Sequence, residues 1–285
     1  MAAFLRRVVG LYDWLEQIWK HKRTERIAAN LLIMAFLASL VLIELARQGL
    51  LPNELADLLH KNHYYAINVA FSMLLGLEVF GLVFSLANSV SVSVGKQFEI
   101  LSLILLRHSF NEIVYFSEPL VWEEALIPLQ HMLSNAGGGL VIFLLLGVYY
   151  KLQHHRAISR DTGATEHFIA SKKIVSLMLM VLFSIIGTIN GSRYLMGNAL
   201  GDFFSLFYTI LVFSDVLLVL ISLRYSSSFP IVFRNSGFAV ATVLIRLALT
   251  APPYFNVLLG IGAMVFAIGI TLAYNIFEQP PHSHT

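Results

Sequence analysis

The chain has 285 residues, of which 57% are hydrophobic and 13% are charged, and its mean hydropathy is +0.74. Soluble globular chains carry roughly 25% charged residues, so this composition argues against a soluble fold. The net charge of +2 gives no reason to expect nucleic acid as a partner. The chain has no cysteine, which excludes disulfides, thiolate metal sites and iron–sulfur clusters. We therefore expect a protein embedded in a lipid bilayer, with the bilayer as its first partner.

The first 26 residues combine apolar side chains at helical spacing with six basic residues. This pattern is typical of an amphipathic helix that lies on a membrane surface. The segment has no apolar core followed by a small-residue cleavage site, so we do not expect a removed signal peptide. The predicted organisation is an interfacial helix over 1–26, a transmembrane domain over 27–277 and a disordered tail over 278–285.

Eight apolar segments, separated by polar residues or by Gly and Pro, predict an all-α polytopic bundle. A helix needs about 20 apolar residues to cross ~30 Å of hydrocarbon. The predicted spans cover about residues 27–47, 65–94, 97–116, 126–150, 174–195, 203–224, 232–250 and 254–277.

The third of these segments, 97–116, carries Glu99, Arg107, His108 and Glu112. By hydropathy it would also suit an amphipathic helix on the cytoplasmic face, which would leave seven spans. The charges in the loops favour eight spans. With eight spans, 14 of the 19 Lys and Arg residues lie on the side of the N-terminus and 3 lie on the other side. This bias is typical of the cytoplasmic side, so we expect both termini there.

The fourth span is irregular in sequence. Pro128 and the glycine triplet 137–139 precede its most apolar run. Proline and clustered glycine weaken a helix, and broken backbone at membrane depth persists only where protein or water satisfies it. We therefore expect a kinked or re-entrant element here.

Ionisable side chains within the spans are the candidate functional residues, because a charge in hydrocarbon is costly unless it is paired or hydrated. They are Glu78, Arg107, Glu112, Asp215 and Arg246. A turn near Gly95 would place Glu78 and Glu112 at similar depth, with Arg107 ~7.5 Å from that level. This predicts a Glu78–Arg107 pair, which would serve either helix packing or transport.

Small and polar residues also recur along the second span at spacings of three and four. They are Glu78, Gly81, Ser85, Asn88 or Ser89, and Ser93. Such a stripe could line a hydrated path from Glu78. It would equally suit a helix contact made by small residues, and base rates favour this second interpretation.

Asp215 lies near the middle of the sixth span, where a carboxyl group is either protonated or paired. Arg246 in the seventh span is a candidate partner, although it lies nearer the outer end. The alternative for Arg246 is that its side chain extends to the membrane interface. Two arginines twelve residues apart, Arg234 and Arg246, do not supply the regular charges of a standard voltage sensor.

The motifs of several function classes are missing. His60 and His63 have metal-ligand spacing but no third ligand, and only His108 and His131 fall near spans, so the sequence predicts no metal and no haem. There is no P-loop or GxGxxG motif, so we expect no nucleotide cofactor.

Three hypotheses remain. The first is a secondary transporter or channel-like protein for protons, small ions or a small solute, with Glu78 and Asp215 as titrating groups and Arg107 as counter-charge. The second is a non-catalytic scaffold or regulatory subunit that binds protein partners or self-associates through its helices. The third is an intramembrane enzyme, which would need carboxylates and His108 or His131 to converge around a cavity. The charge bias is compatible with a bacterial inner membrane.

Overall fold

The computed structural model describes residues 2–52, 62–86, 90–153, 162–195, 203–223 and 228–278. Helices dominate this part of the chain, and no strand occurs in it. In order, the elements are α1 (Ala2–Trp19), α2 (Lys22–Arg47), α4 (Tyr65–Ser85), α5 (Val90–Asn111), the 3₁₀-helix η1 (Glu112–Tyr115), α6 (Trp122–Leu152), α7 (Thr162–Leu195), α8 (Phe203–Leu223), α9 (Phe229–Thr250) and α10 (Phe255–Glu278).

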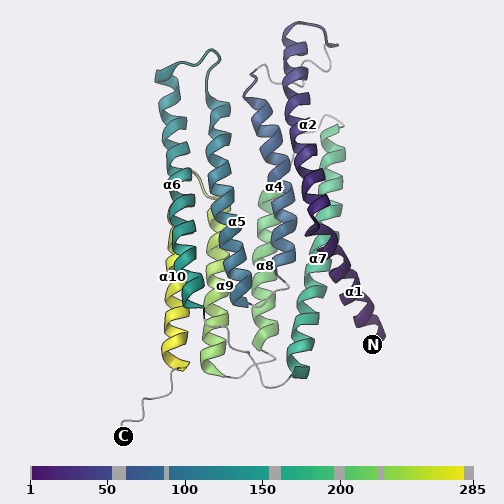
Figure 1. Cartoon of the computed structure of the whole chain (residues 1–285), viewed down its shortest axis with the longest axis vertical. Coiled ribbons are helices and arrows are strands. Elements are labelled where there is room, and N and C mark those ends of the chain that lie inside the picture. Colours follow the sequence, from purple (N-terminus) through teal and green to yellow (C-terminus); the bar gives the residue numbers. More distant parts are fainter. Residues whose placement is uncertain are drawn as a thin grey trace.

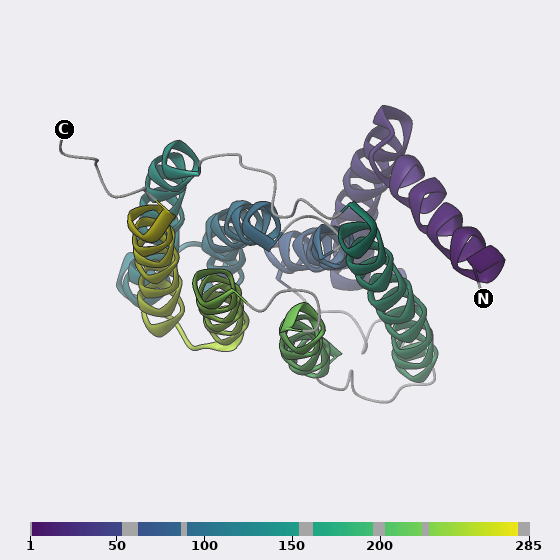
Figure 2. The same cartoon turned by 90° about the horizontal axis from the view of Figure 1, so that it is seen from below.

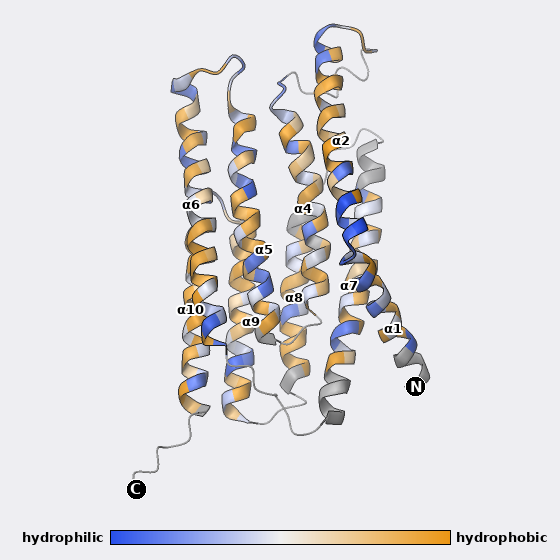
Figure 3. Cartoon of the chain, viewed as in Figure 1, coloured by the Kyte–Doolittle hydropathy of each residue, from blue (hydrophilic) through white to orange (hydrophobic). Residues whose placement is uncertain are grey.

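Six helices in the described ranges are long and apolar enough to cross a membrane. They are Lys22–Arg47, Tyr65–Ser85, Trp122–Leu152, Ile169–Asn190 within α7, Phe229–Thr250 and Phe255–Phe277 within α10. Hydrophobic residues cover most of their length (Figure 3). The expectation of an all-α fold is thus confirmed for the described residues, and the six apolar helices are compatible with an integral membrane protein. The more polar α5 and the short apolar segment Leu206–Ile221 of α8 are not among the six.

The long helices run side by side along the long axis of the molecule (Figure 1). In the end view, α6 and α10 lie at one side of the bundle and α1 and α2 at the other (Figure 2). Helix α5 lies between α6 and α4, and it also contacts α9. This central position matters because α5 carries polar residues that face several neighbours.

Helices α5, α6, α9 and α10 share one apolar core, which includes Phe98, Ile142, Phe238 and Met264. Glycines bring these helices close together. A Cβ atom on Gly139 would lie 2.9 Å from the backbone oxygen of Ser102. Close backbone approach of this kind is typical of packed membrane helices.

The re-entrant alternative for the fourth span is wrong, because α6 is one uninterrupted helix of 31 residues that contains Pro128, whereas a kink in this helix stays a prediction. Gly138 and Gly139 are buried contact points against α10 and α5, respectively. Their small size serves helix packing here. Pro128 is tolerated near the start of the helix, where only the first turns precede it.

The predicted turn near Gly95 is also wrong. Helix α4 ends at Ser85, and Gly95 lies inside α5, where an added Cβ would lie 2.7 Å from the ring of Tyr150. The polar stripe expected on the second span therefore cannot continue on one helix to Ser93, which belongs to α5. Asn88 and Ser89 lie outside the described residues.

Helix α1 packs against α4 and α7. Tyr12 is fully buried, and its hydroxyl donates a hydrogen bond of 2.8 Å to the backbone oxygen of Phe84. Burial raises the pKa of Tyr12, which keeps this hydroxyl protonated. Lys173 of α7 pairs with Asp13 at 2.6 Å. These contacts hold α1 beside the end of α4. The predicted tail, 278–285, lies almost entirely outside the described residues.

Candidate functional site

Asp215 and Arg246 form an ion pair between α8 and α9. The Arg246 Nε atom lies 3.4 Å from Asp215 Oδ2, and the two side chains are only 1% and 4% exposed, respectively. Extension of Arg246 to the interface is therefore wrong, since its side chain is enclosed by protein. Within the described part of the chain, Asp215 Oδ2 and the Nε and Nη1 atoms of Arg246 have no hydrogen-bond partner. The pair thus has hydrogen-bonding capacity left over.

Polar residues from neighbouring helices surround this pair. Arg246 Nη2 donates a hydrogen bond of 3.1 Å to Oε1 of Gln97 on α5, and Gln97 is itself buried. The Gln97 amide nitrogen lies 3.4 Å from the hydroxyl of Ser93. Thr242, one turn before Arg246 on α9, uses its hydroxyl to donate to the backbone oxygen of Ala239. Three helices thus contribute to one buried polar cluster.

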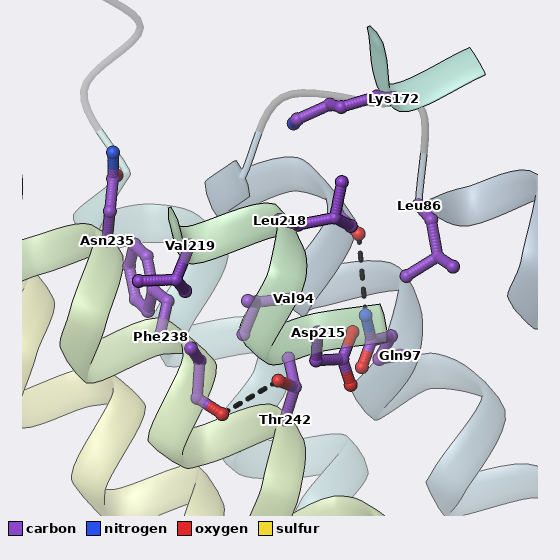
Figure 4. A pocket seen from close by; sticks show the side chains of 12 residues that line it. Leu86, Val94, Gln97, Lys172, Asp215, Leu218, Val219, Asn235, Phe238 and Thr242 are labelled. Carbon is purple, nitrogen blue, oxygen red and sulfur yellow. Dashed lines mark hydrogen bonds between the residues drawn. The ribbon is translucent and has the colours of Figure 1, made fainter. Parts of the chain in front are cut away.

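A cavity of about 40 Å³ adjoins Asp215, and we call it the Asp215 cavity. Figure 4 shows Asp215, Gln97 and Thr242 close together on one side of it, with Lys172 of α7 on the other. The polar residues that line it are Ser93, Gln97, Lys172, Asp215, Asn235 and Thr242. A polar cavity needs about 10–15 Å³ of such volume to hold one water molecule. The Asp215 cavity is therefore suited to a few water molecules.

Glu78 and Arg107 form a second ion pair, between α4 and α5, as the sequence predicts. Their side chains are 11% and 26% exposed, respectively, so this pair is less enclosed than the first. A cavity of about 20 Å³, here called the Glu78 cavity, adjoins the pair. His108 and Asn111 also line it. Within the described residues, Glu78 Oε2 and Asn111 Oδ1 are buried without a hydrogen-bond partner.

The two cavities share one face of α5. Ser93 and Gln97 line the Asp215 cavity, while Ile104, His108 and Asn111 line the Glu78 cavity. The spacings of four, seven, four and three residues place all five side chains on one stripe of the helix. We call it the α5 stripe. It begins and ends with polar residues and is apolar in between.

The remaining predicted site residues lie elsewhere. Glu112 belongs to η1, and its Oε2 atom lies 3.3 Å from Nδ1 of His131 on α6, so it does not join the Glu78–Arg107 pair. Ser85 is buried and donates to the backbone oxygen of Leu82 in its own helix. Asn88 lies outside the described residues. No group of three or more metal-ligating side chains occurs in the described ranges.

Four residues of the site, Gln97, Lys172, Asn235 and Thr242, are absent from the sequence-based candidates. Asn235, Thr242 and Arg246 follow spacings of seven and four, so a single polar face of the seventh span was available as a signal. Lys172 gave no such signal. The sequence places it in a loop, whereas α7 begins at Thr162 and buries it.

Comparison with protein-family models, curated proteins and solved structures finds no match to this chain. The two ion pairs and their cavities are therefore the features from which a function can be inferred.

Proposed function

We propose that this membrane protein is a secondary transporter or a channel-like protein for protons, small ions or a small solute. One observation supports the proposal most directly. An ion pair of a carboxylate and a guanidinium lies toward each end of the α5 stripe, buried for Asp215–Arg246 and partly buried for Glu78–Arg107, and each adjoins a small cavity lined by polar and apolar side chains. Glu78 and Asp215 are the proposed titrating groups, and Arg107 and Arg246 are their counter-charges.

The cavities favour transport over a purely structural role. A buried ion pair that only fixed packing could be replaced by well-packed apolar side chains without loss of stability. It would need no adjoining space. Within the described residues, Glu78 Oε2 and Arg246 Nη1 are buried without a hydrogen-bond partner, and a water-sized cavity adjoins each pair. Ionisable groups arranged in this way inside a membrane are typical of ion pathways and proton relays.

The proposal includes a topology of eight spans, in which α5 and α8 also cross the bilayer and both termini are cytoplasmic. In support, α5 is flanked by spanning helices on both sides and buries Phe98, Leu101 and Ile104 almost completely. The bias of Lys and Arg toward one side supports the orientation. The same bias is compatible with a bacterial cytoplasmic membrane, which is the location that we propose.

The proposal is tested with purified protein in sealed vesicles, as flux driven by an imposed potential and followed by a pH dye or by radioactive ions. We expect Glu78→Gln and Asp215→Asn each to reduce flux at least tenfold while the protein remains folded. Glu123→Gln is the matched control, because Glu123 is exposed at the start of α6. Normal flux in both cavity variants would disprove the role of the carboxylates. A folded wild-type protein without flux for any tested ion would favour the scaffold hypothesis.

A further inference from the structure

We propose that the species carried is the proton, and that Leu82 and Ile104 form the apolar barrier between the two cavities. This inference rests on the proposed transport function and deepens it. It follows from the size of the cavities, from the charges that line them and from the residues that separate them.

The cavities are too small for an organic solute. At about 40 and 20 Å³, they have room for a few water molecules at one site and one at the other. Small-molecule sites are usually clefts of about 300–1,000 Å³. The candidates that fit are water, a proton and a bare monatomic ion.

The charges in the cavities disfavour monatomic ions of either sign. A metal cation beside Asp215 would meet Arg246 and Lys172, and a cation beside Glu78 would meet Arg107. An anion would meet the carboxylate in each case. Repulsion between like charges is strong where water is scarce. A proton avoids this conflict, because it bonds to the carboxylate and neutralises it. A hydronium ion gives its proton to the Asp215 carboxylate and leaves a carboxylic acid and one water molecule.

The apolar barrier follows from the register of α4 against α5. The two helices are antiparallel neighbours, and Glu78 contacts Arg107. One turn further along α4 therefore brings Leu82 to the level of Ile104 on α5. Leu82 is 0% exposed and Ile104 is 1% exposed, so both are enclosed by protein. On the α5 stripe, Ile104 lies between Gln97 and His108.

This arrangement limits the resting leak of protons. Hydrophobic constrictions in channels block conduction because water does not wet them. With Leu82 against Ile104, the Asp215 cavity exchanges protons with one side of the membrane and the Glu78 cavity with the other. Passage between them requires these two side chains to part.

The absence of native cysteine makes the barrier directly testable. Single Ser93→Cys, Ile104→Cys and Asn111→Cys variants are treated with silver ions from one side of sealed vesicles of known orientation. Silver ions are small enough for water-sized cavities. The cationic side chains slow their entry, but silver binds a thiolate so tightly that each ion that enters remains bound, and the protected fraction accumulates during a long exposure. The protein is then denatured and treated with a maleimide dye. A thiol that has reacted with silver is not labelled by the dye, so the loss of labelling measures the reaction. We expect cysteine at position 93 to react from one side only and cysteine at 111 from the opposite side only. Position 104 lines the Glu78 cavity, so cysteine there should react from the same side as 111 and not from the side of 93.

A second experiment opens the barrier by substitution. In a chain that carries Ser93→Cys, adding Ile104→Ser should raise at least tenfold the rate at which silver reacts at position 93 from the side that is unreactive when Ile104 is present. The matched control is Leu103→Ser, since Leu103 is the preceding residue of α5 and is 45% exposed on its outer face. It should leave the rate unchanged. Reaction at position 93 from both sides with Ile104 intact would overturn the barrier and leave the path standing. Failure of both 93 and 111 to react from either side would overturn the transport path itself.

The identity of the ion is tested in the same vesicles. We expect an imposed potential to drive uptake that a pH dye reports, with a rate that is unchanged when sodium is replaced by potassium, or chloride by a bulky organic anion. Uptake of labelled sodium or chloride without a pH change would overturn the assignment to protons while supporting transport.

Discussion

The molecule has two halves that are packed in different ways. In one half, α5, α6, α9 and α10 approach closely at glycines and share one apolar core. In the other half, α4, α7 and α8 meet through larger side chains such as Phe183 and Phe207, and α2 lies at the edge. Within the spanning window of α9, 44% of the residues are buried, against 6% in α2. The first half is therefore the close-packed half, and the second is the open half.

The candidate site lies at the boundary between the two halves. Each ion pair joins a helix of one half to a helix of the other, and the arginine is on the same half in both pairs. Arg107 and Arg246 belong to the close-packed half, while Glu78 and Asp215 belong to the open half. The guanidinium groups are thus on the more firmly held helices. Elements with fewer buried contacts open more readily, so the carboxylates lie on the side better suited to move.

Loss of Arg246 is expected to reduce the stability of the protein more than the other substitutions below. Arg246→Met leaves the Asp215 carboxylate buried without its partner, so we expect a loss of about 3–5 kcal/mol in the free energy of unfolding. Arg107→Met should cost less, because that pair is more exposed. Chemical unfolding in mixed detergent micelles measures both. Adding Asp215→Asn to Arg246→Met should restore part of the loss. Equal losses in the two arginine variants would contradict the difference between the pairs.

A second prediction tests the close helix contacts of the close-packed half. Gly139→Ala places a methyl group 2.9 Å from a backbone oxygen of α5, which cannot move aside as a side chain can. We expect a loss of about 2 kcal/mol in the free energy of unfolding. The control is Gly137→Ala two residues earlier, where the added atom meets nothing within 4 Å. That change should be neutral or stabilise the helix by up to ~1 kcal/mol.

A smaller effect probes the attachment of α1 to the open half. Tyr12→Phe removes the hydrogen bond to the Phe84 backbone oxygen and keeps the ring, so we expect a loss of about 1 kcal/mol. Tyr115→Phe is the matched control, since Tyr115 is 72% exposed. Limited proteolysis of α1 provides the second measurement. Cleavage of α1 should become faster in the Tyr12 variant alone.

The smallest effect concerns a polar contact outside the spans. The His63 backbone N–H donates to Glu118, and this bond, with the His63 side chain and Arg47 nearby, holds the pKa of Glu118 below its ordinary value of 4.5. The contact thus adds stability above that value and loses it as the pH falls through the folded-state pKa. We expect Glu118→Gln to weaken the acid dependence of the unfolding temperature.

The sequence predicted the helices well because apolar runs of this length have few other structures in a bilayer. It predicted the Glu78–Arg107 pair for a reason that was partly wrong, since Gly95 lies inside α5, which begins at Val90, rather than at a turn. Two expectations that were based on glycine residues were wrong, the turn near Gly95 and the re-entrant break at the triplet 137–139. Gly95 and the triplet 137–139 are typical of turns and breaks, yet here all four lie within helices, and Gly95, Gly138 and Gly139 are contact points between helices. Local propensity does not show which neighbour a glycine will face.

The Asp215–Arg246 pair was harder to predict. Counting residues from the ends of two spans assumes that both helices begin at the same level, and the level of a helix is set by tertiary packing. The burial of Lys172 likewise depends on α7 continuing beyond its apolar part toward Thr162. Such offsets between helices leave no local trace in the sequence.

Because each ion pair joins the two halves, forces that the bilayer exerts on the halves also act on the ion pairs. Neutralising a carboxylate weakens the attraction between the halves, and by thermodynamic reciprocity any force that separates the halves favours the neutral carboxylate. Lipids press most directly on α2, of whose spanning window only 6% is buried, and α2 contacts α4, which carries Glu78. Membrane tension and thickness would therefore act on the charge state of Glu78 and Asp215 without touching either residue.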